Sequence, residues 1–399
     1  MSNFNEIKPI MLAEETISQS DLEATAEWML AGNRLTKSEV TTQFEQEFAQ
    51  WMGCEHAVFV NSGSSANLLM IYAAKEAGRL RNNKVIAPAV SWVTTVSPLM
   101  QLGFDVRLCD CDPVNLGLDL DHLEALFRDE APAMLVLVHV LGHANHLQEI
   151  QAICDRYDVV LLEDSCEALG STFEGRKLGC HGLAGSFSFY YGHHISTIEG
   201  GMVVTDDAEL HQVMLSLRSH GWSRDLDPKR QNHLQKQHNV DDFRNLYTFY
   251  HAGFNLRSTD LQAYIGRRQL EKLDDICETR AWNFATYSGL LPDFYCQQSD
   301  TDMLSSFAYG TLVENRMEVF EALKAQQIEC RPLICGNIAR HPFWVRKYGE
   351  QVLPTADLIH DFGIYLPNHH NLTANDIARV TTVFKSVARP LERPLQKIA

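Results

Sequence analysis

Short apolar runs alternate with longer amphipathic segments over the first 250 residues of this 399-residue chain. The apolar runs, at residues 56–60, 85–87, 106–109, 134–140 and 159–162, have the length of buried strands. Between them, residues 66–77, 95–102, 120–127 and 147–157 carry apolar side chains three and four positions apart, which is helical spacing. This alternation predicts an α/β fold with a mostly parallel sheet that is covered by helices on both faces.

The pattern changes after residue 200. A strand at 202–204 and a helix at 208–218 precede a polar stretch, 224–242, which predicts a long surface loop. From residue 259 the spacing predicts one long helix through residue 276 and towards residue 290, and then a smaller α+β region. We therefore expect a large domain over residues 1–255 and a small C-terminal domain, led by this helix, over residues 256–399.

Composition narrows the class of protein. Hydrophobic residues make up 45% and charged residues 21%, which is typical of a globular chain. With 51 acidic and 34 basic residues the net charge is −17, which disfavours nucleic acid as a partner. The apolar run around residues 134–141 is about half of the roughly twenty residues that a membrane span needs. The N-terminal MSNFNEIKPI lacks a basic stretch followed by an apolar core, so we expect no signal peptide and a soluble, cytoplasmic protein.

The ten cysteines are spread along the chain. Only Cys109 with Cys111, and Cys330 with Cys335, lie close in sequence, and neither pair has the spacing of a zinc site. Without a secretion signal, disulfides are also disfavoured. We expect thiols that pack as small apolar groups and no metal; metal binding is the weaker alternative.

Four segments at predicted strand ends carry candidate chemistry, and the first is residues 61–67, NSGSSAN. Its glycine lets a ligand approach the backbone, its hydroxyls donate hydrogen bonds, and the helix that it opens offers free N–H groups to an anion. The segment predicts a phosphate site at Gly63, Ser64 and Ser65. A serine-capped helix without a ligand is the alternative.

The second and third segments each place one distinctive side chain at a strand end. Trp92 follows the strand at 85–87 and could stack on a flat ring, or pack in the core. Asp164 follows the apolar run at 159–162, where a buried carboxylate needs a partner. A protonated heterocyclic nitrogen would serve as that partner; a helix cap or an arginine-paired structural carboxylate is the alternative.

The fourth segment, residues 186–201, is a strand followed by a loop that carries His193 and His194 and closes on two glycines. Histidine titrates near neutrality, so a positioned imidazole can take and return a proton. Two hydrogen-bonded loop histidines without a catalytic role are the alternative. A metal site is disfavoured because adjacent side chains diverge and no carboxylate is spaced to complete a ligand set.

In this order the segments resemble the DegT/DnrJ/StrS family, the sugar aminotransferases of pyridoxal-phosphate fold type I, from about residue 20 to the C-terminus. The resemblance implies an aspartate aminotransferase-like fold, whose large domain has a mostly parallel mixed sheet and binds the cofactor. It implies pyridoxal 5'-phosphate or pyridoxamine 5'-phosphate as that cofactor. It also implies a homodimer with shared active sites, because the position of Asn255 reaches the neighbouring subunit's phosphate in that family. The implied cofactor-binding residues are Gly63, Ser64, Ser65, Trp92, Asp164, Glu167, Ser188 and Asn255.

One position departs from the majority of the family. Its aminotransferases carry a cofactor-binding lysine several residues before a G-E-G-G turn, and here that position, counted back from Glu199, is His193. An imidazole cannot make the covalent link, so the resemblance implies a non-covalently bound cofactor. The string HHISTIEGG resembles a small branch of the family, the nucleotide-sugar 3-dehydratases, and segments 91–95, 219–224 and 330–332 agree with it.

This branch implies removal of the 3-hydroxyl of a nucleotide-linked 4-keto-6-deoxy sugar, with His193 as the catalytic base. L-Glutamate would restore the amine form of the cofactor, and ammonia and 2-oxoglutarate would be released. Arg224 and Arg257 are the candidates for binding the glutamate carboxylates, and a surface or interface ion pair is the alternative for each. The residues expected to bind substrate are His220, Arg224, Arg257 and Arg331. GDP is the expected nucleotide, with CDP and dTDP open. A sugar aminotransferase, a native lysine replaced by engineering, and a non-catalytic cofactor-binding relative remain alternatives.

Overall fold

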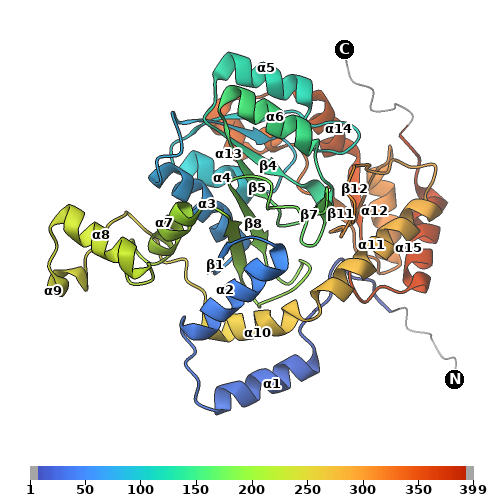
Figure 1. Cartoon of the computed structure of the whole chain (residues 1–399). Helices are drawn as coiled ribbons and strands as arrows, with labels where there is room; N and C mark the ends of the chain where they lie inside the picture. Colours follow the sequence, from blue (N-terminus) through green and yellow to red (C-terminus); the bar gives the residue numbers. More distant parts are fainter. Residues whose placement is uncertain (1–7, 392–399) are drawn as a thin grey trace.

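A seven-stranded sheet lies at the centre of the computed structural model, which describes residues 8–391 (Figure 1). Its strand order is β1–β9–β8–β5–β4–β2–β3. The bounds are β1 His56–Val60, β2 Lys84–Pro88, β3 Asp105–Cys109, β4 Met134–Val138, β5 Val160–Asp164, β8 Ala184–Ser188 and β9 Gly201–Thr205. Only β9 runs against its neighbours, β1 and β8, and the other pairs are parallel. The predicted α/β class with a mostly parallel mixed sheet is confirmed.

Alternate residues of β4 belong to two different cores, because successive side chains of a strand point to opposite faces. Val136 and Val138 pack with α3 (Gly63–Glu76), α4 (Val93–Gln101) and α7 (Ala208–Arg218). Leu135 and Leu137 pack with α5 (Leu120–Glu130) and α6 (Leu147–Tyr157), which lie side by side in Figure 1. Burial on both faces explains the uninterrupted apolar strands.

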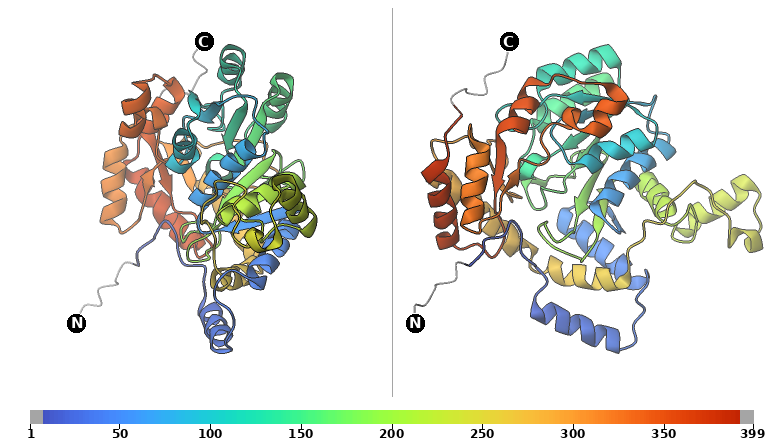
Figure 2. Two further views of the ribbon diagram at one scale, coloured as in Figure 1. Left: turned by 90° about the vertical axis from the view of Figure 1, so that its left-hand side faces the viewer. Right: turned by 180° about the vertical axis from the view of Figure 1, so that it is seen from behind.

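Two N-terminal helices, α1 (Gln19–Leu30) and α2 (Glu39–Met52), have no counterpart in the sequence predictions. Phe44 of α2 contacts the ring of Phe59 on β1 at a centroid distance of 5.0 Å. In contrast, α1 lies outside the sheet and packs on α10 (Asp260–Leu270), where the rings of Trp28 and Tyr264 stack at 4.9 Å (Figures 1 and 2). The helix α1 is therefore attached to the body mainly through α10.

The prediction of one continuous helix from residue 259 is wrong. The chain forms α10, capped by Thr259, and then α11 (Leu273–Leu290), which leaves at an angle towards the C-terminal part (Figure 1). Apolar spacing continues across the two-residue turn at 271–272, so the periodicity does not register the change of direction.

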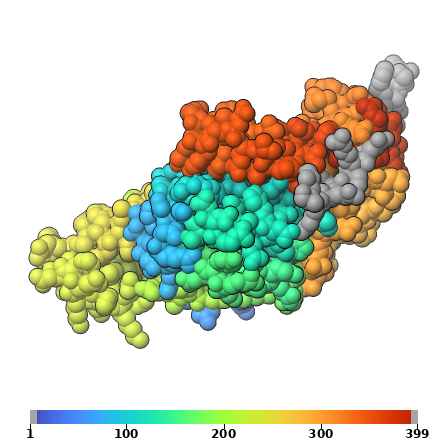
Figure 3. Space-filling model, turned by 90° about the horizontal axis from the view of Figure 1, so that it is seen from above, coloured from blue at the N-terminus to red at the C-terminus, as the bar shows by residue number. Residues whose placement is uncertain are grey.

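A second, three-stranded antiparallel sheet follows, in the order β10 (Tyr309–Leu312), β12 (Gly363–Leu366) and β11 (Arg331–Pro332). It shares a core with α11, α12 (Arg316–Ala325) and α15 (Ala374–Val387). The helices α13 (Pro342–Tyr348) and α14 (Pro354–Phe362) instead add Trp344 and Ile359 to the core of the large sheet, and Figure 3 shows their segment in orange-red along the cyan part of the chain. The division at residue 255 stays a prediction.

The prediction of a long loop over residues 224–242 is also wrong. Residues 228–238 form α8 (Pro228–His238), followed by α9 (Asp242–Asn245), and both project from the body (Figures 1 and 2). Asp227 caps α8 by accepting from the backbone N–H of Arg230 at 2.8 Å, and Asn239 ends it with φ 51°. Leu234 is its only buried residue, so the helix lacks the apolar stripe on which the prediction relied.

Short elements complete the described chain: a hairpin of β6 (Thr172–Phe173) and β7 (Arg176–Lys177), and 3₁₀ turns at Val140–Gly142 and Ile338–Arg340. The first turn ends the strand predicted for residues 134–140 at Val138. All ten cysteines carry free thiols. Across residues 8–391, no helix has the length and apolar character to cross a membrane. The signal-peptide prediction concerns residues 1–10, of which 1–7 lie outside the described residues.

Candidate active site

A cavity of about 380 Å³ opens where β4, β5 and β8 end. Ligand sites in open α/β sheets form at the carboxyl ends of parallel strands. Most of the predicted site residues line this cavity: Gly63, Ser64, Trp92, Asp164, Glu167, Ser188, His193 and Arg331. Segments far apart in the sequence therefore meet in one site.

The start of α3 forms one wall. The Ser62 hydroxyl caps the helix by accepting from the backbone N–H of Ser65 at 3.1 Å. A Cβ added to Gly63 would lie 2.5 Å from the Cβ of Ser188, so only glycine lets the end of β8 approach the helix this closely. Free N–H groups of a helix start beside two hydroxyls, those of Ser64 and Ser188, make a site for an anionic group such as phosphate.

Ser65 is not brought to the cavity. Its hydroxyl donates to Oδ1 of Asn61 at 2.6 Å, and Ser65 is absent from the cavity wall. Each helical residue turns its side chain by about 100° from the preceding one, so Ser64 and Ser65 cannot face the same ligand equally. The Ser65 hydroxyl is therefore directed to Asn61 in this structure, and a role of Ser65 in phosphate binding stays a prediction.

Asp164 ends β5 and is 5% exposed. Its Oδ2 accepts hydrogen bonds from the Asn67 amide and from the Thr95 hydroxyl, both at 2.7 Å, while Oδ1 accepts from the backbone N–H of Cys166 at 3.2 Å. All three donors are neutral, and no described residue forms an ion pair with this carboxylate. The arginine-paired alternative is therefore wrong, and a protonated ring nitrogen in the cavity is a suitable partner.

Asn67 and Thr95 line the cavity and bind Asp164, and the sequence predictions do not include them. Asn67 lies one helical turn after Gly63, on the same face of α3, so the predicted phosphate segment already contained the signal for it. Thr95 lies in the first turn of α4, three residues after Trp92. Trp92 itself is 56% exposed and lines the cavity, so the alternative of a core tryptophan is wrong.

The imidazole of His193 lines the cavity with a defined tautomer. Its Nδ1 donates to the backbone carbonyl of Cys166 at 2.8 Å, because a carbonyl oxygen can only accept; Nε2 is left as the acceptor. Burial lowers the pKa of His193 to about 4, so the ring is neutral at pH 7. A neutral imidazole with a free Nε2 can accept a proton.

His194 points away from the cavity. It is fully buried, its Nε2 donates to the carbonyl of Ser305 at 3.0 Å, and burial holds its pKa well below the ordinary value. The two histidines diverge, so the alternative of a hydrogen-bonded loop histidine describes His194. Within residues 8–391, no group of three or more histidine, cysteine, aspartate or glutamate side chains is arranged to hold a metal ion.

Glu167 brings a second proton-carrying group to the wall. One of its carboxyl oxygens, Oε2, accepts from the backbone N–H of Leu141 at 2.8 Å. Burial raises the pKa of Glu167 to about 8. The carboxyl is mostly protonated at pH 7 and can then donate a hydrogen bond into the cavity.

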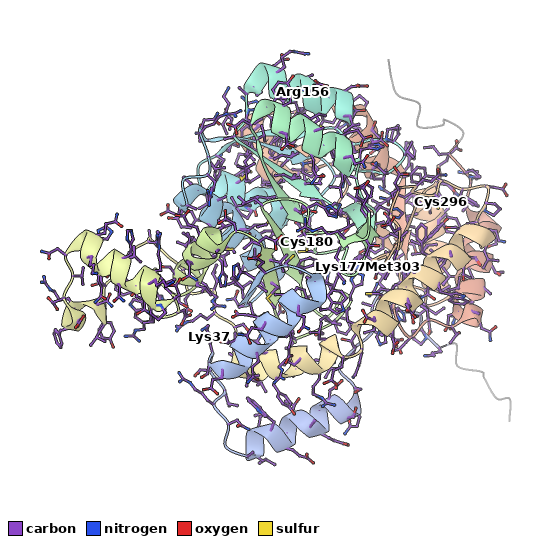
Figure 4. The ribbon with its side chains drawn as sticks, viewed as in Figure 1. Lys37, Arg156, Lys177, Cys180, Cys296 and Met303 are labelled. Carbon is purple, nitrogen blue, oxygen red and sulfur yellow. The ribbon has the colours of Figure 1, made fainter. Side chains whose placement is uncertain are left out.

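Among the described residues, no lysine lines the cavity. Lys177, labelled in Figure 4, lies on β7; its Nζ donates to the carbonyl of Trp51 at 2.7 Å and lies 4.4 Å from the centre of the indole ring. The cavity therefore offers no amine for a covalent link to an aldehyde.

Four predicted site residues gather elsewhere, at the base of the projecting arm, which we define as residues 222–250. Arg257 lies 3.2 Å from Nε2 of His220 and donates to Oδ1 of Asn255 at 3.0 Å. Arg224 lies 4.3 Å from the ring centre of Trp222. None of the four lines the cavity of its own chain, so of the predicted substrate-binding residues only Arg331 does.

Three aromatic residues also line the cavity: Tyr190, Phe307 and Tyr365. No pattern in the sequence predicts them as site residues. Phe307 and Tyr365 lie in the C-terminal part, where an aromatic side chain next to a strand ordinarily indicates core packing. Only the approach of the small sheet to the large one places them at the site.

The DegT/DnrJ/EryC1/StrS aminotransferase family matches the chain over residues 16–385. The chain belongs to this family. The resemblance inferred from the sequence is thereby confirmed.

Similar proteins in the family include 3-dehydratases. The GDP-4-keto-6-deoxy-D-mannose 3-dehydratase of Yersinia pseudotuberculosis is 34% identical over 387 residues, which cover 94% of this chain and 98% of that protein. A solved GDP-4-keto-6-deoxymannose-3-dehydratase with a trapped PLP–glutamate geminal diamine matches with a TM-score of 0.85 and 32% identity, over 94% of this chain and 99% of the other. A histidine-to-asparagine mutant of such an enzyme with bound GDP-perosamine matches with a TM-score of 0.87 and 31% identity, over 94% and 100%. The aspartate aminotransferase-like fold type is confirmed.

Proposed function

We propose that this protein is a nucleotide-sugar 3-dehydratase that depends on pyridoxal or pyridoxamine phosphate. Its substrate would be a nucleotide-linked 4-keto-6-deoxyhexose, with GDP-4-keto-6-deoxymannose as the first candidate because similar 3-dehydratases act on it. The observation that carries the proposal is the imidazole of His193 in a cavity without a lysine. This side chain can move a proton but cannot hold an aldehyde covalently.

The cavity has the groups that such a cofactor needs. The start of α3, with Gly63, Ser64 and Ser188, would hold the phosphate. Asp164, buried with neutral donors only, would pair with the ring nitrogen, and the exposed indole of Trp92 would lie against the ring. The amine form of the cofactor would supply a nucleophile for the sugar's 4-ketone and a ring that can accept electrons.

His193 would perform the proton transfers. Its Nε2, free to accept while Nδ1 is bound to the Cys166 carbonyl, would take a proton from the cofactor's methylene carbon, and the 3-hydroxyl would leave the sugar as hydroxide. The same nitrogen can return this proton to the departing oxygen. The hydrogen bond to Cys166 keeps the ring from rotating between the two transfers.

L-Glutamate would regenerate the amine form, with release of ammonia and 2-oxoglutarate over the complete cycle. Arg331, exposed on β11 and part of the cavity wall, is the candidate for binding a glutamate carboxylate. The PLP–glutamate adduct in a similar 3-dehydratase supports this role for glutamate.

A second copy of the chain would complete each site. Asn255, Arg257 and His220 lie together, with Arg224 against the ring of Trp222, and none of the four lines its own chain's cavity, as is expected for residues of a shared site. The projecting arm also exposes large apolar side chains, including Phe243 at 83% and Tyr247 at 70%, which is typical of a surface that becomes buried in an oligomer.

The test of the reaction is a panel of GDP-, CDP- and dTDP-linked 4-keto-6-deoxy sugars, each incubated with protein, cofactor and glutamate. Mass spectrometry and an ammonia assay should find a 3-deoxy-4-keto sugar with one ammonia per turnover. An aminosugar without free ammonia would contradict the proposal and favour an aminotransferase. An unchanged cofactor spectrum on mixing would instead favour a non-catalytic relative.

The shared site is tested by mixing two inactive variants, Asn255→Ala and His193→Asn, after dissociation and reassociation. If Asn255 serves the partner's site, half of the mixed dimers' sites are intact, and about a quarter of wild-type activity should return. If Asn255 acts in its own chain, the mixture should stay inactive.

A further inference from the structure

The guanidinium of Arg280, on α11, is buried next to the loop that carries His193. Its Nη2 donates to the carbonyl of His193 at 3.2 Å. Its Nη1 donates to the carbonyls of Phe307 at 3.0 Å and Asn368 at 2.6 Å, with Ser306 at 3.4 Å. One side chain therefore joins the catalytic loop to two separate segments of the C-terminal part.

No described carboxylate forms an ion pair with Arg280, so its charge is met by carbonyl dipoles. Burial lowers the pKa of Arg280 to about 10, which leaves the group a cation at neutral pH. An unpaired buried cation is costly and could be replaced by an apolar residue in a purely structural core. This arrangement suggests that the charge and the planar fork of the guanidinium are used.

Arg280 holds His193 in two ways. The backbone carbonyl of His193 is bound directly, and Phe307, held by the same guanidinium, places its ring 5.1 Å from the imidazole. The nearby positive charge also disfavours the imidazolium, which adds to burial in lowering the pKa of His193. Arg280 thus affects both the position and the pKa of His193.

We propose that Arg280 is a positioning residue that fixes the loop and the packing partner of His193. The proposal rests on the proposed function of His193 as the base. Several other groups act on the same imidazole or line the cavity with it: Asp164, Cys166, Glu167, His194, Arg331 and Tyr365. Asp164 opposes Arg280, because its negative charge favours the imidazolium.

Two substitutions separate the two effects. Arg280→Lys keeps a cation but loses the fork that joins four carbonyls, whereas Arg280→Met removes both. The pKa of His193 is measured in the cofactor-free protein by NMR with ¹³C-labelled histidine, and the resonance is assigned by its loss in His193→Asn. The pH profiles of kcat and KM are measured in parallel on the holoenzyme.

We expect Arg280→Met to raise the pKa of His193 by about 1 and to move the acid limb of kcat to higher pH. Arg280→Lys should leave that pKa near its wild-type value and lower kcat about tenfold with little change in KM, since misplacing a base affects the chemical step. Arg316 supplies matched controls: it also donates to backbone carbonyls, those of His360 and Gly363, but it binds neither the carbonyl of His193 nor that of Phe307. Arg316→Lys and Arg316→Met should change neither quantity.

The proposal is overturned if the Arg280 variants match their Arg316 counterparts in His193 pKa, kcat and pH profile. If Arg280→Met fails to fold, Arg280→Lys alone tests the proposal. A kcat and a pH profile of Arg280→Lys equal to those of the wild-type enzyme would overturn the positioning role. The NMR result does not depend on the reaction, so a wild-type protein that dehydrates no sugar would refute the proposed function while leaving the effect of Arg280 on the imidazole measurable.

Discussion

Oδ2 of Asp164 lies 2.7 Å from the amide nitrogen of Asn67 and accepts from it a hydrogen bond that links the end of β5 to α3. The hydroxyl of Thr95 on α4 donates to the same oxygen, also at 2.7 Å. Two helices that begin at the cavity thus orient the Asp164 carboxylate, which is available to a ring nitrogen. Because these donors are neutral, they hold the charge without neutralising it.

We predict that Thr95→Val weakens cofactor binding about 10- to 100-fold, because a hydrogen bond to a charged group contributes roughly 1.5–3 kcal/mol. The dissociation constant is measured by titrating the cofactor-free protein and following absorbance. Thr381→Val, on α15 and remote from the cavity, is the control. Equal dissociation constants for the two variants would mean that Thr95 does not support Asp164.

Because no lysine lines the described cavity, borohydride treatment of the holoenzyme should leave the cofactor removable by denaturation and dialysis. Mass spectrometry of the intact chain checks this outcome. The His193→Lys variant is the positive control, since it restores an amine in the cavity. A reduced adduct on any lysine of the wild-type chain would contradict the non-covalent site.

Replacing His193 by asparagine should lower dehydration about 10²–10⁴-fold, the usual contribution of a general base, while cofactor binding persists. His193→Lys should divert part of the product to aminosugar. His194→Asn is the matched control: it removes a buried hydrogen bond to Ser305, so we expect a lower thermal midpoint with the product unchanged. Ammonia and 3-deoxysugar per turnover are compared side by side. If only His194→Asn abolished the deoxysugar, the base would be assigned to the wrong histidine.

Glu167 should make the cofactor-free protein less stable as pH rises. Its pKa is about 8 when folded against 4.5 ordinarily, so between these values the folded state binds more protons than the unfolded state, and stability falls with rising pH. Glu167→Gln cannot ionise but still offers an oxygen to the Leu141 N–H. The variant's stability relative to wild type should therefore grow by about 1 kcal/mol or more from pH 5 to pH 8.

Thermal midpoints of both proteins over this pH range, at one protein concentration, check the expectation for Glu167. Glu167→Ala serves as the control, because it removes the ionisable group and leaves the Leu141 N–H without its acceptor. A pH-independent difference between wild type and Glu167→Gln would show that the carboxyl ionises normally in the fold.

Local patterns in the sequence carry much of the fold. Strands that are buried on both faces appear as continuous apolar runs, and polar residues begin where each strand leaves the sheet. For this reason the sequence predicts Asp164 and the start of α3 at one edge of the sheet, whereas the role of Ser188 is implied by the family resemblance. The loop histidine was identified by its distance along the chain from Glu199, which is again a local relationship.

Errors arose where local periodicity carries no information. The helix α8 buries only Leu234, so its polar sequence predicts a loop although Asp227 and Asn239 are good caps. Apolar spacing continues across the turn between α10 and α11, so it predicts a single helix. Ser64 and Ser65 are equivalent in a motif but not on a helix, where one faces the cavity and the other binds Asn61.

The amino-acid sequence by itself determined the α/β layering, the strand ends that carry the site and the histidine at the lysine position, since each is encoded by neighbours along the chain. The tertiary structure alone decided which donors hold Asp164, which nitrogen of His193 is free, and that Arg280 joins its loop to the C-terminal part. These contacts join residues that lie tens of positions apart or more. They exist only once the packing of both sheets brings the segments together, and no local pattern specifies that packing.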